Sequence, residues 1–200
     1  MTFEEFYGRH YVKMLEAQKQ LQDMVYNYEK RINKEDINPV MYVSARIKQP
    51  DSMLAKLKKQ GYEQTLDAAL HDVFDAIGLR IICSFVSDVY DLVSWLHEQY
   101  EIEIIQEKDY YAYPKPNGYR SYHVLLKIRE GIGKDLYAEI QIRTIAIDCW
   151  ASLEHQIKYK KKLPNEQMIQ EELKRCADEI ASTDLSMQAI RDILRNAENL

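Results

Sequence analysis

The stretch Glu139-Ile140-Gln141-Ile142-Arg143 decides the fold around it. An acid, an amide and a base alternate with two isoleucines. Successive side chains of a β-strand point to opposite faces, so the three polar residues share one face and the isoleucines lie on the other. The stretch therefore predicts a strand with a buried apolar face and a polar face suited to the floor of a binding site.

Strand and helix patterns alternate on both sides of this stretch. Strands are expected at 42–48, 79–85, 103–106, 119–129 and 136–144. Helices are expected at 51–61, 66–77, 89–100 and 145–162, the last ending near Pro164. Asp51 is the expected N-cap of the first of these helices, Gly61 its end, and Gly78 the end of the second. The order predicts one α/β domain with a mixed sheet flanked by helices.

Both ends of the chain have the apolar spacing of heptads. One seam comprises Tyr7, Tyr11, Met14, Gln18, Leu21, Val25, Tyr28 and Ile32, and the other comprises Ile169, Leu173, Cys176, Ile180, Thr183, Met187, Ile190 and Leu194. Each seam could pack against its own core, against the other seam or against a second subunit. The Asn38-Pro39 break gives an N-terminal helical segment 1–37, a core 38–163 and a C-terminal helical segment 164–200.

Composition restricts the class of protein. The 200 residues are 46% hydrophobic and 30% charged, enough for one sizeable core. The acidic N-terminus has no apolar leader, and no stretch approaches the roughly 20 apolar residues of a membrane span. Cys83, Cys149 and Cys176 lack metal-ligand spacing and favour a reducing cytoplasm. The net charge of −5 argues against broad nonspecific binding of nucleic acid.

Two carboxylates are placed beside predicted strands. Asp75 precedes the strand that follows Gly78, and Glu139 lies on the strand quoted above. If both meet at one edge of the sheet, they suit Mg²⁺, a hard ion that prefers oxygen and shares its shell with phosphates and water. An isolated Asp is more often a cap or a surface charge, so a metal site here is favoured only together with the neighbouring residues.

Cations accompany these acids near strand ends. They are Arg46, Lys48, Lys56, Arg80, Lys108, Lys115, Arg120 and Arg143. Such positions in an acidic protein suit neutralisation of a polyphosphate, although solvated surface charges are the usual alternative. Charge alone does not separate the two interpretations.

The loop 113–123 supplies aromatic faces. Asn117-Gly118 marks a tight turn, and Tyr119 and Tyr122 lie next to cations, where a tyrosine can stack on a purine. Strand alternation places Tyr119, Ser121 and His123 on one face. His123 could bind a phosphate or form a hydrogen bond in the core.

Several common mechanisms fit poorly. The six glycines form no phosphate loop, no Cys/His zinc pattern occurs, and no serine lies in a G-x-S-x-G elbow. His71-Asp72 has the dipeptide of metal-dependent phosphohydrolases, but the remaining histidines are in unsuitable contexts. We interpret that dipeptide as a coincidence.

Taken together, these residues resemble the synthetase domain of the RelA/SpoT family. The resemblance covers about residues 40–160 and rests on five motifs in order: 44–48 (SARIK), 75–80 (DAIGLR), 115–123 (KPNGYRSYH), 139–144 (EIQIRT) and 150–155 (WASLEH). It implies a nucleotidyltransferase-like mixed sheet and a stand-alone small alarmone synthetase. The implied reaction moves pyrophosphate from ATP to the ribose 3′-hydroxyl of GDP or GTP, giving AMP and ppGpp or pppGpp for the stringent response.

The resemblance also implies roles for residues. Asp75 would bind Mg²⁺, with Glu139 as second ligand or as base for the 3′-hydroxyl. Arg46 and Arg80 would sandwich adenine, and Lys48, Ser52 and Lys56 would contact the ATP phosphates. The acceptor would be stacked by Tyr119, held at its phosphates by Lys108, Lys115, Arg120 and His123, and touched by Gln141 and Asp148. Arg143, Glu154 and His155 are further candidates. In-line transfer needs position and charge neutralisation, which explains the absence of a nucleophilic Ser or Cys.

One position departs from the family. Ala45 stands where the family has glycine. A small residue is retained, so we expect function to survive. A homo-oligomer, with a tetramer favoured, is expected from the seams and the resemblance, and no membrane or nucleic acid is expected to be needed for catalysis. Two alternatives stay open: the same donor chemistry on tRNA, and a noncatalytic nucleotide- or RNA-binding oligomer. Intact Asp75 and Glu139 argue against the latter.

Overall fold

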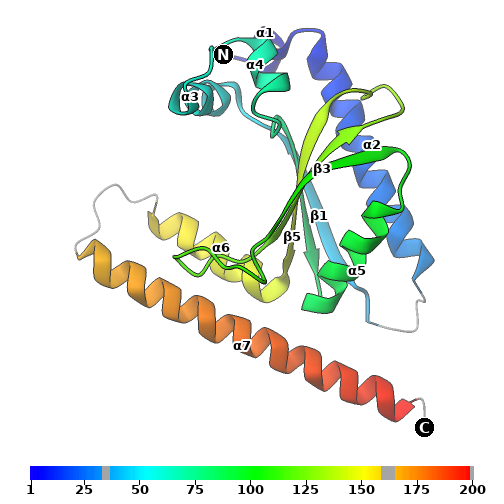
Figure 1. The fold of residues 1–200 in the computed structure, drawn as a ribbon, viewed down its shortest axis with the longest axis vertical. Helices are drawn as coiled ribbons and strands as arrows, with labels where there is room; N and C mark the ends of the chain where they lie inside the picture. The colour runs from blue at the N-terminus through cyan, green and yellow to red at the C-terminus, as the bar shows by residue number, and fades with distance from the viewer. Residues whose placement is uncertain (33–36, 159–164, 199–200) are drawn as a thin grey trace.

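A mixed sheet forms the centre of the computed structural model, which describes residues 1–32, 37–158 and 165–198 (Figure 1). The five strands found in these residues are β1 (Val40–Ile47), β2 (Ile77–Cys83), β3 (Ile102–Asp109), β4 (Tyr122–Ile128) and β5 (Tyr137–Thr144). Their order is β1-β2-β5-β4-β3. β2 and β5 are parallel, and the other neighbours are antiparallel. The predicted mixed sheet is confirmed.

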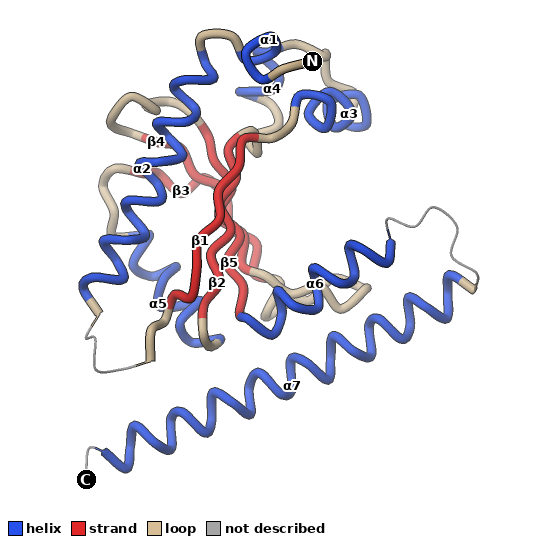
Figure 2. Tube along the Cα trace, turned by 180° about the vertical axis from the view of Figure 1, so that it is seen from behind, coloured by secondary structure: helices blue, strands red, loops and turns tan. Residues whose placement is uncertain are grey.

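Two helices cover one face of the sheet. α2 (His10–Arg31) and α5 (Val86–His97) lie on the same side, and the short α1 (Phe3–Tyr7) precedes α2 (Figures 1 and 2). Ile140 and Ile142 are fully buried beneath them, as the alternation in β5 predicted. α2 buries Met14 and Leu21 in the same core. The N-terminal seam is thus used for packing within the chain.

The opposite face of the sheet is flanked at its two ends. α3 (Pro50–Gln60) and α4 (Leu66–His71) lie at one end, and α6 (Ile145–Lys158) and the long α7 (Glu166–Glu198) lie at the other (Figures 1 and 2). The polar face of β5 lies between these groups of helices. None of the helices in the described ranges is long and apolar enough to cross a membrane.

Several element boundaries differ from the prediction, and the largest differences lie between α3 and β2. Asp51 does not cap α3, because the helix begins one residue earlier with Pro50, which lacks an N–H and suits the first helical position. Gly61 ends α3 in the left-handed conformation, as predicted. α4 ends at His71 and not at Ile77, because Ile77 already pairs with β1 and β5. Gly78 therefore lies inside β2. The predicted end of the helix after 145, at 162–164, falls outside the described residues.

The second half of the C-terminal seam does not pack against the core of its own chain. Ala177, Asp184 and Arg191 face inward, whereas Met187 and Ile190 are about half exposed. The reason is polar contact: Asp184 Oδ2 accepts a hydrogen bond of 2.6 Å from Thr144, and Arg191 pairs with Asp88 at 3.1 Å. These bonds turn the apolar stripe outward.

Candidate active site

One cross-strand row of residues carries polar side chains through every strand of the sheet. Ser44 of β1 pairs with Arg80 of β2, which pairs with Gln141 of β5. Gln141 pairs with His123 of β4, and His123 with Lys108 of β3. Four of these five residues are predicted site residues. The register thus aligns positions that are up to 97 residues apart in sequence, from Ser44 to Gln141.

A cavity of about 200 Å³ lies beside this row. In the neighbouring row, Gly78 of β2 pairs with Arg46 on one side and Glu139 on the other. Because Gly78 has no side chain, it leaves space between them, a common use of glycine in a strand. The lining also includes both arginines predicted to hold adenine; it comprises Ser44, Ala45, Arg46, Asp75, Gly78, Leu79, Arg80, Glu139 and Gln141.

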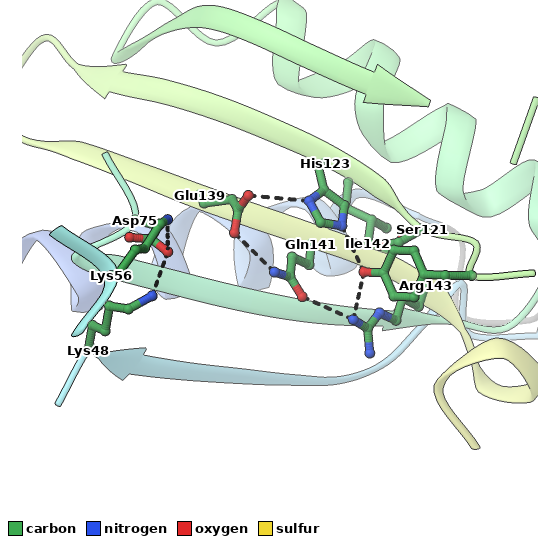
Figure 3. A network of polar contacts seen from close by, with 10 residues as sticks. Lys48, Lys56, Asp75, Ser121, His123, Glu139, Gln141, Ile142 and Arg143 are labelled. Atoms are coloured by element: carbon green, nitrogen blue, oxygen red, sulfur yellow. Dashed lines mark hydrogen bonds and ion pairs between the residues drawn. The ribbon is translucent and has the colours of Figure 1, made fainter. Parts of the chain in front are cut away.

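Asp75 lies at one end of the cavity between two lysines. Its Oδ2 accepts from Nζ of Lys48 and of Lys56, each at 2.7 Å (Figure 3). Its Oδ1 is buried and has no hydrogen-bond partner among the described residues. No group of three or more His, Cys, Asp or Glu suited to a metal occurs there. An orphaned carboxylate oxygen with Glu139 nearby in the cavity still fits Mg²⁺, which binds one or two carboxylates and completes its shell with water and phosphate.

Glu139 is held ionised by its neighbours. Burial alone would raise the pKa of its carboxyl, but hydrogen bonds from His123 and Gln141, with the charges of His123 and Lys56, outweigh burial and lower this pKa to about 2. Oε1 lies 3.2 Å from Nδ1 of His123, and Oε2 accepts from Nε2 of Gln141 at 3.0 Å. Glu139 is therefore a carboxylate at every ordinary pH.

These contacts continue into a closed ring of side chains (Figure 3). Nη2 of Arg143 donates to Oε1 of Gln141 at 3.1 Å and to the Tyr119 hydroxyl at 2.8 Å. The same hydroxyl lies 2.8 Å from Nε2 of His123. The ring Tyr119, His123, Glu139, Gln141 and Arg143 fixes each member through two others, and such networks favour one geometry. Arg143 is buried, and its 5.2 Å distance from the Tyr119 ring centroid also allows a cation–π contact.

Asp148 connects this ring to the far edge of the sheet. Its Oδ1 accepts from Arg143 at 3.2 Å and lies 3.6 Å from Arg80, while Oδ2 accepts from the Tyr42 hydroxyl at 2.9 Å. Asp148 thus lies between both predicted nucleotide sites. Tyr42 was missed by sequence reasoning, although strand alternation places it on the face of Ser44 and therefore could have found it.

The remaining predicted residues of the acceptor side are spread over a loop and its neighbours. β4 begins at Tyr122, so Tyr119 and Ser121 both precede the strand. Ser121 is buried and donates to the carbonyl of Ile142. Nζ of Lys115 lies 4.8 Å from the centroid of Tyr119 and 4.6 Å from that of Tyr110. Tyr110 was also missed, and its position after Lys108 was the available signal.

Other predicted residues lie at the ends of the site. Ser52 is exposed in the first turn of α3, and Lys108 is exposed on β3. Glu154 of α6 accepts from Asn117 of the loop at 3.0 Å, while His155 is exposed on α6. Arg120 directs its guanidinium toward α7, where it pairs with Asp178 at 3.0 Å. The structure therefore places Arg120 against a helix instead of in the cavity.

A cavity beside a mixed sheet, lined by two carboxylates and several cations, suits an enzyme that transfers phosphate-bearing groups. A family model described as "Region found in RelA / SpoT proteins" matches residues 45–163. The chain belongs to this RelA/SpoT family. It is 40% identical over 157 residues to GTP pyrophosphokinase YwaC of Bacillus subtilis (strain 168), which covers 77% of this chain and 75% of that protein.

Two solved structures are similar over nearly the whole chain. A GTP pyrophosphokinase family protein from Streptococcus pneumoniae has a TM-score of 0.83 at 34% identity, covering 98% of this chain and 97% of that one. Small alarmone synthetase 1 from Bacillus subtilis, bound to its product pppGpp, has a TM-score of 0.82 at 28% identity, covering 93% and 96%. The fold and the kind of enzyme predicted from the motifs are thereby confirmed.

Proposed function

We propose that this enzyme transfers the pyrophosphoryl group of ATP to the ribose 3′-hydroxyl of GDP or GTP, forming ppGpp or pppGpp and AMP. The observation that carries the proposal is the polar row with its cavity, where Asp75 and Glu139 lie among cations. Similarity to GTP pyrophosphokinases supports the same reaction. Phosphate transfer of this kind depends on positioning and charge neutralisation, which these residues supply.

The donor is expected in the cavity. Arg46 and Arg80 lie on neighbouring strands. Arg80 pairs directly with Ser44, and Arg46 lies two residues after Ser44, so the two arginines are diagonal neighbours. Two guanidinium planes at such positions can lie on either side of a flat purine. Lys48 and Lys56 flank Asp75 at the far end, where they suit the polyphosphate.

The acceptor is expected along β4 and the loop before it, with guanine on Tyr119. Its 3′-oxygen attacks the β-phosphorus of ATP, the bond from that phosphorus to the α-phosphate oxygen breaks, and AMP leaves. The hydroxyl proton goes to a base, and Glu139 is the carboxylate placed to receive it. Each of its oxygens accepts one hydrogen bond in the ring and retains a second lone pair, which can accept from the 3′-hydroxyl.

We include Mg²⁺ in this proposal, with Asp75 as first ligand and Glu139 as second. When bound, the ion would neutralise phosphate charge and order the donor. The orphaned Oδ1 of Asp75 supports the assignment. We also propose a cytoplasmic location and a role in the stringent response, which the free thiols and the nucleotide substrates support.

Incubation with labelled ATP, Mg²⁺ and either GDP or GTP tests the reaction. Labelled tetraphosphate or pentaphosphate is expected, with AMP released in equal amount. A parallel reaction contains tRNA in place of the guanine nucleotide. Label on tRNA alone would replace the proposal with the tRNA-modifying alternative, and no transfer to either acceptor would favour a nucleotide-binding protein.

Replacing Tyr119 with alanine is expected to weaken binding of the guanine nucleotide by roughly 1–3 kcal/mol, the value of one base-stacking contact. Tyr119→Phe is the matched control because it keeps the aromatic ring and removes only the hydroxyl, with its contacts to Arg143 and His123. Titration calorimetry with GDP and with an ATP analogue measures both sites. Equal losses for the two nucleotides in Tyr119→Ala would contradict the assignment of this residue to the acceptor.

We propose that the enzyme is a homo-oligomer, with a tetramer favoured. The exposed stripe of α7, which includes Met187, Ile190, Ile193 and Leu194 at 52–67% exposure, supports this because contiguous apolar surface commonly marks an interface. Light scattering coupled to size exclusion should give a mass above the 23.7 kDa of one chain. Ile190→Lys combined with Leu194→Lys should shift the mass downward, and a monomeric wild type would refute the proposal.

A further inference from the structure

Helix α7 packs directly against the loop that carries Tyr119. Gly118 is buried with φ +85°, and a Cβ added there would lie 2.6 Å from Cβ of Ala177. The two backbones can therefore approach this closely only because position 118 is glycine. The contact lies immediately before the residue assigned to guanine.

Arg120 fastens the same loop to the helix. Its Nη1 donates to the carbonyl of Gly118 at 2.9 Å and to that of Ala177 at 3.4 Å, and its Nη2 donates to Oδ1 of Asp178 at 3.0 Å. The Arg120 side chain is 15% exposed. Charge-assisted bonds from a fork-shaped guanidinium fix orientation as well as distance. Arg120 thus joins the turn to two successive residues of α7.

α7 itself is fixed relative to the strand of the active site. Asp184 accepts from the Thr144 hydroxyl at 2.6 Å, and Thr144 is the last residue of β5. Near its start, the carbonyl of Leu173 accepts from the indole of Trp150 at 2.9 Å. The helix therefore forms a frame that holds the loop at a set position relative to Glu139.

We propose that α7 is part of the acceptor site, and that Arg120 and Asp178 are positioning residues that set the affinity for the guanine nucleotide by placing Tyr119 and Lys115. This inference rests on the proposed function, since it takes these two residues as the acceptor contacts. In this proposal Arg120 binds α7 and positions the loop, whereas the sequence predicted that Arg120 would bind the phosphates of the acceptor.

Asp178→Ala tests the proposal in the full chain. Loss of the charge-assisted bond is expected to raise KM for GTP by about fivefold or more while KM for ATP and kcat at saturating GTP stay at wild-type values. Glu179→Ala is the matched control, because Glu179 is the next acid on α7 and pairs with Arg175 of the same helix. Lys174→Ala accounts for the second partner of Asp178, at 2.7 Å.

Binding of GDP, measured by calorimetry without turnover, separates this inference from the proposed reaction. A wild type that binds GDP but forms no product would sink the reaction and leave the positioning role to be decided by the binding data. If Asp178→Ala is unstable, Asp178→Asn keeps the volume and should shift GDP affinity in the same direction by less. Equal effects of Asp178→Ala and Glu179→Ala, or equal losses for ATP and GDP, would overturn the proposal.

Discussion

Replacing Glu139 with glutamine is expected to lower kcat by about a hundredfold or more, as loss of a general base does. The amide has nearly the same volume, so the fold and nucleotide binding should persist. It removes the negative charge that faces His123 and the cavity, and it can neither accept the 3′-hydroxyl proton nor serve well as a second metal ligand. Steady-state kinetics with ATP and GTP measure the loss, and calorimetry measures the retained binding.

Glu103→Gln is a suitable control, since Glu103 is a carboxylate on β3 that pairs with Arg129 away from the cavity. Near-wild-type turnover in Glu139→Gln would refute the role of Glu139.

The pH dependence of the free energy of unfolding gives a second test of Glu139. The pKa of Glu139 lies below its usual 4.5, so its ionised form stabilises the fold above that pH and loses this contribution as the pH falls toward about 2. The stability difference between the wild type and Glu139→Gln should therefore narrow in that range.

Local sequence patterns predicted the face of β5 correctly, because the period of a strand is a property of the backbone. The alignment of Ser44, Arg80, Gln141, His123 and Lys108 into one row could not be predicted in the same way. It depends on a parallel pairing of β2 with β5 and on β4 lying beside β5, and these pairings are set by tertiary packing. The motifs indicated which residues to consider, and the register indicates which of them meet.

The early end of α4 and the outward apolar stripe of α7 have related causes. Val73 and Ile77 continue the apolar spacing of α4, yet both lie outside that helix. Val73 is buried in the connection after α4, and Ile77 is buried as the first residue of β2. On α7, polar residues occupy the inward positions because partners on the sheet and α5 satisfy them. A hydrophobic pattern identifies an apolar stripe, but which stripe faces the core is decided by polar partners that are distant in sequence. The contact of Arg120 with α7 could not be predicted for the same reason, because its partners on that helix are also distant in sequence.

Replacing Asp75 with asparagine is expected to have the largest effect, a loss of kcat of roughly a thousandfold or more, in the range that follows from removing preorganised charge at a transferring phosphate. Asp75 is the anion that holds Nζ of Lys48 and Lys56 at 2.7 Å, and its Oδ1 is the orphaned atom assigned to Mg²⁺. The amide removes the proposed ligand and leaves two ammonium groups without their counter-charge.

The loss of the metal ligand and the loss of the counter-charge are expected to have different effects on turnover and on ATP affinity. Without the carboxylate, Lys48 and Lys56 are more available to the polyphosphate, so affinity for ATP should be retained or increased while turnover is lost. Calorimetry with a nonhydrolysable ATP analogue, with and without Mg²⁺, measures the affinity for ATP. The dependence of binding on Mg²⁺ should disappear in Asp75→Asn. Asp72→Asn controls for the change of charge, because Asp72 is exposed just after α4. A parallel loss of ATP affinity and turnover would instead mean that Asp75 serves to hold the two lysines in place.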